Sequence, residues 1–232
     1  MNDFHSQGFE IVREVFTKDE VEAMREEADR LSKNEGSACV RHIRSKSKEF
    51  NQLAKSVRLQ NLLSKGLSPV RSILFDKTPQ ENWPVTWHQD LTITVEEKCE
   101  IKGYGPWSTK DGSVHVQPPV EVLERMMTIR IHLDDTPQKN GALRVIPESH
   151  KRGKIESREV LSHVNASEAI CACGAGDVLL MSPLILHSSK RSESPKRRRI
   201  LHFEYARLNS LDDRLSWHEP SQSEPVASGQ HR

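Results

Sequence analysis

The chain has few cysteines, no long apolar segment and no recognisable leader. Its four cysteines are too few and too scattered for a disulfide scaffold in 232 residues: Cys39, Cys99, Cys171 and Cys173. The last two lack the second ligand pair of a structural zinc site, so we expect reduced thiols. No stretch approaches the ~20 apolar residues of a membrane span. The N-terminus lacks the basic and apolar regions of a signal peptide, and we therefore expect a cytoplasmic protein.

Net charge is nearly absent as well. The 34 Lys and Arg residues balance 33 Asp and Glu residues, leaving a formal charge of +1. This balance removes the general electrostatic reason for binding nucleic acid. A chain of this length can bury a core without disulfides or metal staples. We expect one domain over residues 1–218, followed by a loose polar tail over 219–232.

Two helices are expected in the first third of the chain. Thr17 and Glu20 form a capping box, after which apolar residues recur at helical spacing: Val21, Met24, Ala28 and Leu31. A second apolar series predicts another helix ending near Gly66: Leu53, Val57, Leu59, Leu62 and Leu63. We expect residues 1–67 to be mainly helical cover rather than a functional site.

Beyond Pro69 the pattern changes to short strands separated by turn residues. Six strands are predicted: Val70–Phe75, Val85–Trp87, Met127–Leu133, Ala142–Ile146, Asp177–Leu186 and Arg199–Tyr205. The absence of long helices between them favours a mainly β jelly roll (cupin-like) with outer helices and a β core over 68–207. The long segment 96–120 is expected to be a lid, with Trp107 contacting substrate. Trp87, Phe75 and Phe203 are expected to pack in the core.

Three polar residues fall where strands reach a rim. His88 and Asp90 are two residues apart in an extended segment, so their side chains can point to the same place. His187 ends an apolar strand just before a polar stretch. Two histidines and a carboxylate form the facial triad of Fe(II) oxygenases, but zinc hydrolases use the same set. A buried histidine bonded to a nearby aspartate is the plainer alternative for the His88 pair.

A run of four cations opens the last strand. Lys196 to Arg199 cannot all point to one side of a strand, so some must face inward or lie on the preceding loop. An inward arginine beside an iron site would suit a dicarboxylate, because guanidinium pairs with carboxylate through two hydrogen bonds. A solvated basic run or a localisation signal is the alternative.

These motifs together resemble the phytanoyl-CoA dioxygenase-like family of Fe(II)/2-oxoglutarate-dependent oxygenases. The resemblance rests on WHQDL, on NGALRVIPESHKRG at Asn140–Gly153, and on H-x-S with an arginine eleven residues after the histidine. It covers about Gly8 to Tyr205 in element order. The resemblance implies a double-stranded β-helix, or jelly roll, that uses Fe(II), 2-oxoglutarate and O2 and releases succinate and CO2.

The same resemblance implies a role for individual residues. His88, Asp90 and His187 match the iron ligands. Arg198 and Ser189 match the groups that hold the far carboxylate of 2-oxoglutarate. Arg130 stands where many members have a large aromatic residue, on a polar strand face with Thr128 and His132. It is therefore a further candidate for cosubstrate or anionic substrate binding, with a structural ion pair as the alternative.

The expected activity is hydroxylation or another oxidation of a small molecule. Asp90 disfavours a halogenase, because related halogenases replace this carboxylate with Gly or Ala. Three rivals stay open: a zinc-dependent hydrolase using the same triad, a non-catalytic jelly-roll binding or sensor protein, and a nucleic-acid binder acting through Lys196–Arg199. The primary substrate and the oligomeric state are not indicated by the sequence.

Overall fold

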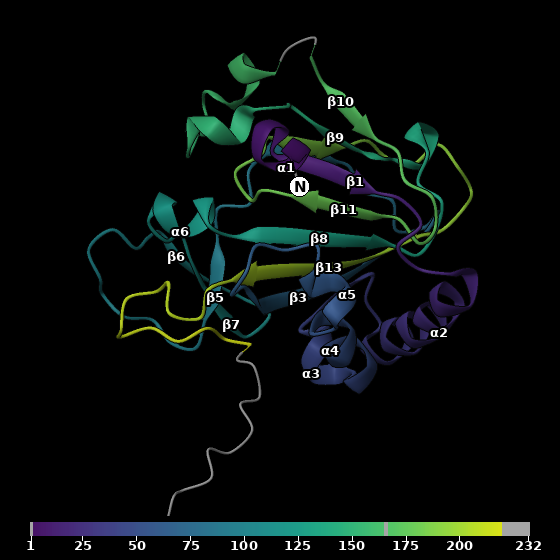
Figure 1. Ribbon diagram of the computed structural model, residues 1–232, viewed down its shortest axis with the longest axis horizontal. Helices are drawn as coiled ribbons and strands as arrows, with labels where there is room; N and C mark the ends of the chain where they lie inside the picture. The colour runs from purple at the N-terminus through teal and green to yellow at the C-terminus, as the bar shows by residue number, and fades with distance from the viewer. Residues whose placement is uncertain (1, 165–166, 220–232) are drawn as a thin grey trace, which may run out of the picture.

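A computed structural model describes residues 2–164 and 167–219, and most of this part is antiparallel sheet (Figure 1). The largest sheet runs in the order β1-β11-β8-β13-β3-β2. Its strands are β1 (Phe9–Val12), β2 (Cys39–Arg41), β3 (Ser68–Lys77), β8 (Met127–His132), β11 (Val178–Met181) and β13 (Arg198–Ala206). The two edge strands β1 and β2 come from the first 67 residues, where the sequence predicted only helices. With four and three residues, these strands are too short for an alternation of apolar and polar residues to predict them.

A four-stranded sheet faces the first and completes the jelly roll. Its order is β10-β9-β12-β4, with β4 (Val85–His88), β9 (Leu143–Val145), β10 (Ala169–Cys171) and β12 (His187–Ser189). The predicted strand Asp177–Leu186 is in fact shorter, because the chain turns at Ser182–Leu186 and crosses to the second sheet at His187. Apart from this difference, the predicted jelly-roll fold is confirmed.

Helices cover the outer face of the large sheet, next to β3 in Figure 1. Helix α2 (Lys18–Glu35) begins at Thr17 with the predicted capping box and buries the predicted apolar residues. The predicted helix ending near Gly66 is shorter and interrupted: its first residues belong to α4 (Lys48–Ala54), its middle to α5 (Val57–Gln60), and turns follow Gln60. A further short helix, α3 (Ile43–Lys46), precedes α4. Ser56 interrupts the predicted helix, because its side chain caps the backbone N–H of Leu59; Ser47 caps the start of α4 in the same way.

The two faces of the large sheet differ in character. On β8 the residues Ile129 and Ile131 point outward into the core beneath the helices. Arg130 and His132 point inward and line a pocket between the sheets. The other end of the space between the sheets is closed by apolar residues of β9, β10 and β11 together with the buried free thiols of Cys171 and Cys173.

The segment 96–120 forms regular structure where a lid was expected. It contains a hairpin of β6 (Trp107–Lys110) and β7 (Ser113–Val116), which pairs with β5 (Ile93–Val95) into a three-stranded sheet. Trp107 packs against the apolar cluster on one face of this sheet and is not among the residues that line the pocket. Trp107, paired with Val116 in the strand register, is half-buried rather than exposed. Its contact with substrate and the lid role of the segment stay predictions.

The remaining elements are short connections. They are α1 (Asn2–Gln7), α6 (Val120–Glu124) and the 3-10 helices Gln138–Asn140, Ser149–Arg152 and Val160–His163. Of the expected polar tail, residues 220–232 lie outside the described part. Glu219, by contrast, is buried and accepts hydrogen bonds from the backbone N–H and the hydroxyl of Ser72. No helix within residues 2–164 and 167–219 is long and apolar enough to span a membrane.

Candidate metal centre and its pocket

The H-x-D segment leaves β4 in an extended conformation that is held from its other side. The amide of Gln89 donates to the carbonyls of Gly153 and Leu184 at 2.8 and 2.6 Å, and accepts from the backbone N–H of Ile155 at 2.8 Å. The backbone N–H of Asp90 donates to the carbonyl of Pro183 at 2.9 Å. Because alternate residues point in opposite directions, anchoring Gln89 aims His88 and Asp90 together into the pocket.

His187 joins this pair across the sheet. It begins β12 and lies opposite His88 in the strand register. The Nε2 atoms of His88 and His187 each lie 3.6 Å from an oxygen of Asp90, on Oδ1 and Oδ2 respectively. Their ligand atoms lie within 4.8 Å of one another. The structure therefore brings together the three residues that the sequence singled out.

The donor set fits a divalent metal ion. The Nδ1 atom of His88 pairs with the carbonyl of Thr86 at 2.8 Å, and that of His187 with the carbonyl of Ile185 at 3.0 Å. These bonds place the proton on Nδ1 and leave the Nε2 lone pairs facing Asp90, as in metal-ligating histidines. At metal–ligand distances of about 2.1 Å, donors at right angles lie about 3 Å apart, close to the observed spacing.

Electrostatics favour the metal-binding form of two of the three residues. Burial would raise the pKa of Asp90, but His187 and His88 outweigh it and hold that pKa far below the usual range. Burial, with the neighbouring His88, lowers the pKa of His187 to about 4. An ionised carboxylate and a neutral imidazole are the forms that bind metal. Burial would lower the pKa of His88, but the side-chain contact with Asp90 and the Asp90 charge outweigh burial and raise it, so a metal ion must displace a proton there.

One of the three consecutive arginines faces the pocket. Arg197 pairs with Asp76, Arg199 pairs with Asp134, and both also contact Asp29 on α2. Arg198 is buried, and within residues 2–164 and 167–219 no carboxylate forms a salt bridge with it. Within the described residues, its guanidinium donates one hydrogen bond, to the carbonyl of Asn140 at 3.2 Å. Burial, followed by the nearby Arg130, lowers its pKa to about 10, as expected for a guanidinium awaiting an anion.

The Asn140–Gly141 turn supports this arginine directly. Gly141 has a φ of 68°, and a Cβ there would lie 2.8 Å from Nη1 of Arg198 and from the carbonyl of Lys190. The turn thus needs glycine both for its backbone conformation and for the space that Arg198 occupies. Ser189, the third predicted cosubstrate contact, is buried and lines the same pocket.

Arg130 lines the pocket as well and makes no salt bridge among the described residues. Its Nη1 contacts Nδ1 of His202 at 3.1 Å, and its guanidinium lies 5.4 Å from the ring centre of Phe75. Asp90 is its strongest charge partner, while Arg130 itself lowers the pKa of Arg198. Arg130 therefore shares the pocket with the triad and Arg198 and interacts electrostatically with both. Phe75 was expected in the core, but alternation along β3 turns it into the pocket.

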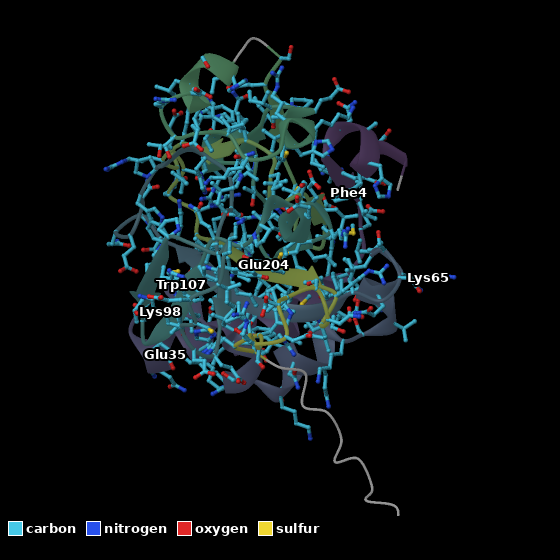
Figure 2. The ribbon with its side chains drawn as sticks, turned by 90° about the vertical axis from the view of Figure 1, so that its left-hand side faces the viewer. Phe4, Glu35, Lys65, Lys98, Trp107 and Glu204 are labelled. Carbon is cyan, nitrogen blue, oxygen red and sulfur yellow. The ribbon has the colours of Figure 1, made fainter. Side chains whose placement is uncertain are left out.

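Several lining residues were missed in the sequence. They are Arg41 on β2, Arg71 and Lys77 on β3, and His202 and Glu204 on β13. Glu204 lies in the interior of the molecule in Figure 2 and pairs with Arg71 at 3.1 Å and with Nε2 of His202 at 3.2 Å. The alternation of side chains along β3 and β13 could have identified those on these two strands, because every second residue of a strand points to the same side. Every second residue from Arg71 to Lys77 and from Arg198 to Glu204 lines a pocket of about 210 Å³.

A jelly roll that holds two histidines, an aspartate and a buried unpaired arginine around one pocket defines the class of Fe(II)/2-oxoglutarate-dependent oxygenases. Within that class, the family model "Phytanoyl-CoA dioxygenase (PhyH)" matches residues 4–200, and the chain belongs to this family. Membership confirms the resemblance seen in the sequence. The protein is an Fe(II)/2-oxoglutarate-dependent oxygenase, and its cofactors are iron and 2-oxoglutarate. A comparison with curated protein sequences found no match.

Solved structures share this fold at low sequence identity. HygX from Streptomyces hygroscopicus, crystallised with nickel and 2-oxoglutarate, is 19% identical with a TM-score of 0.61, over 88% of this chain and 83% of that chain. The epimerase SnoN, in complex with Fe3+, alpha ketoglutarate and nogalamycin RO, is 16% identical with a TM-score of 0.70, over 99% and 90%. EctD from S. alaskensis is 18% identical with a TM-score of 0.68, over 89% and 75%.

Proposed function

We propose that the protein hydroxylates, or otherwise oxidises, a small-molecule substrate while 2-oxoglutarate is converted to succinate and CO2. His88, Asp90 and His187 would hold Fe(II), and the metal would supply the activation of O2. The observation that carries the proposal is the combination of this triad with Arg198, a buried guanidinium that has no carboxylate partner among the described residues. A dianionic cosubstrate supplies the missing charge.

The chain's own residues would bind and orient the cosubstrate. Arg198 and Ser189 would hold its far carboxylate, with Arg198 forming two parallel hydrogen bonds. Arg130, which interacts electrostatically with both Asp90 and Arg198, would contact the end of the cosubstrate nearer the metal. The apolar residues Ile200 and Leu143 in the lining would keep bulk water from the reacting atoms.

The zinc-hydrolase alternative is disfavoured because the pocket offers no free carboxylate, among the described residues, that could act as a general base. A hydrolase of this kind needs a general base near its metal-bound water. Besides Asp90, the pocket lining within the described residues offers Glu204, which is already bound to Arg71 and His202. Structures of HygX and SnoN contain hygromycin B and nogalamycin RO respectively, which supports a small-molecule substrate here as well. We also propose a cytoplasmic location, which the four free thiols favour.

The test combines metal binding with turnover. Wild type should bind one Mn(II) or Fe(II) per chain and form succinate from 2-oxoglutarate, while His187→Ala should lose both. His5→Ala, which removes an exposed histidine on α1, is the control and should change neither. Undiminished metal binding in His187→Ala would contradict the proposed ligands. Zinc-dependent hydrolysis without 2-oxoglutarate would instead favour the hydrolase.

A further inference from the structure

The pocket has two cationic ends, and only one of them belongs to the cosubstrate. On the inner face of the large sheet, Lys77 on β3 lies opposite Arg198 on β13. At the other end of the same strands, Arg71 lies opposite Glu204, and Arg41 on β2 lies opposite Ile73, diagonally across from Arg71 on the same sheet face. All of these side chains line the pocket. Six residues of extended strand separate Arg71 from Lys77, which corresponds to about 20 Å of backbone.

A single 2-oxoglutarate molecule cannot use both ends. Its five-carbon chain is far shorter than this separation, and one of its carboxylates is required beside the metal. Once its other carboxylate lies on Arg198, Arg41 and Arg71 remain. They stand in the same pocket but have no role in binding iron or the cosubstrate.

The carboxylates at the second end do not saturate its arginines. Glu204 is shared between Arg71 and His202. Arg71 gives one further bond, from Nη1 to the carbonyl of Thr92 at 3.1 Å. Arg41 pairs with Asp111 at 2.6 Å, but the Asp111 side chain is 70% exposed at the tip of the β6–β7 hairpin. A pair of this kind is weak, because water and salt screen it.

A buried imidazole beside these arginines also lacks partners. His115 on β7 is 1% exposed, and neither ring nitrogen has a hydrogen-bond partner within the described residues. Thr94 lies directly opposite on β5, and its buried hydroxyl oxygen also has no hydrogen-bond partner within the described residues. Burial, followed by the charge of Arg71, lowers the pKa of His115 to about 4. Neither His115 nor Thr94 lines the pocket itself, so their unmet groups show only that polar atoms close to the arginines lack partners within the described residues.

We propose that Arg41 and Arg71 form a subsite for an oxyanion, a carboxylate or a phosphate, carried by the primary substrate. This inference rests on the proposed function, since it assumes that Arg198 is occupied by 2-oxoglutarate. Asp111 holds Arg41 while the subsite is empty, and the substrate oxyanion takes its place. The substrate is then an anionic small molecule that is bound at one end by two arginines and presents a C–H bond to the metal.

The test uses three probes on one aromatic frame: benzoate, phenyl phosphate and neutral benzyl alcohol. Each is titrated calorimetrically into protein loaded with Mn(II) and saturated with 2-oxoglutarate. At least one anion should bind once per chain, and benzyl alcohol should not. Which anion binds more tightly distinguishes a carboxylate from a phosphate substrate. Absence of binding by both anions, or equal binding of the alcohol, would overturn the inference.

Matched variants locate the binding. Arg41→Gln should weaken the anion at least tenfold without loss of fold, because its partner Asp111 is exposed to water. Asp111→Asn should tighten it several-fold, since a competing carboxylate is removed. Lys110→Gln, an exposed cation on the same hairpin, is the control and should change the affinity less than twofold. Arg71→Gln is informative only if its unfolding midpoint matches that of wild type.

Failure of the subsite and failure of the proposed function give different results. If Mn(II) and 2-oxoglutarate do not bind, the proposed function is contradicted, and the same Arg41 and Asp111 variants still report on anion binding in metal-free protein. If both bind but Arg41→Gln and Arg71→Gln retain wild-type anion affinity, the subsite is contradicted and the oxygenase assignment stands.

Discussion

Replacing Arg198 by alanine should separate cosubstrate binding from folding. Arg198 is 5% exposed, so solvent screens its interactions little. Truncating one partner of a buried, hydrogen-bonded charge pair commonly costs about 2–5 kcal/mol. At about 1.4 kcal/mol per tenfold change, the dissociation constant of 2-oxoglutarate should rise roughly 30- to 4,000-fold. Metal affinity should stay unchanged, because Arg198 contacts none of the three triad residues.

The fold should tolerate this change unusually well for a buried charge. In the free protein Arg198 neutralises no carboxylate of the described residues, so its removal leaves no anion unpaired. Arg197→Ala should behave differently. It would leave the buried carboxylate of Asp76 without its arginine partner and should therefore lower the free energy of unfolding. Arg198→Lys should give an intermediate affinity, since lysine keeps the charge but loses the two-pronged contact.

The assay is anaerobic calorimetric titration of 2-oxoglutarate into Mn(II)-loaded protein, with urea unfolding of each variant alongside. Lys196→Ala is the matched control, because Lys196 is an exposed cation two residues away. An Arg198→Ala dissociation constant within threefold of wild type would refute the reasoning. A strong effect of Lys196→Ala instead would show that the assigned strand register is wrong.

Three further outcomes follow from the same contacts. Gly141→Ala should weaken 2-oxoglutarate binding at least tenfold in the same titration, because the new Cβ would meet the Arg198 guanidinium at 2.8 Å; wild-type affinity would show that the arginine can move. Burial, then Arg198 and Arg130, lowers the pKa of Lys77 to about 7. Its charge is present below that pH, so 2-oxoglutarate affinity at saturating metal should fall as pH rises through 7, and Lys77→Met should flatten this profile. Thr17→Ala should lower the free energy of unfolding by about 1 kcal/mol through loss of the α2 capping box, while leaving turnover unchanged.

Local patterns in the sequence were enough to predict α2 and to single out the H-x-D pair, whereas His187 was added as the end of a separate strand and the ligand roles came from the family resemblance. The capping box at Thr17 acts within one helical turn, and the H-x-D pair depends only on the alternation of one extended segment. Both signals lie within a few residues of chain. The NGAL motif was recognised as a family signature, but its contact with Arg198 was not predicted. That contact joins residues more than fifty positions apart.

What could not be predicted depends on pairing between distant strands. The β6–β7 hairpin is regular only because β5 supplies a partner for β7. Its alternation of apolar and polar residues is too short to distinguish it from an irregular loop. The cations Arg41 and Arg71 are thirty positions apart, and only the pairing of β2 with β3 makes them neighbours.

The arginine run shows where strand alternation alone is decisive. Any one of Arg197, Arg198 and Arg199 could have faced the pocket on charge alone. The apolar residues farther along β13 determine which of the three faces the pocket, because Phe203 and Tyr205 both lie in the core beneath the helices. A strand that buries its odd-numbered residues on the outer face must turn its even-numbered residues inward. The core therefore selects Arg198, and Asp134 and Asp76 neutralise the two arginines that are turned away from the pocket.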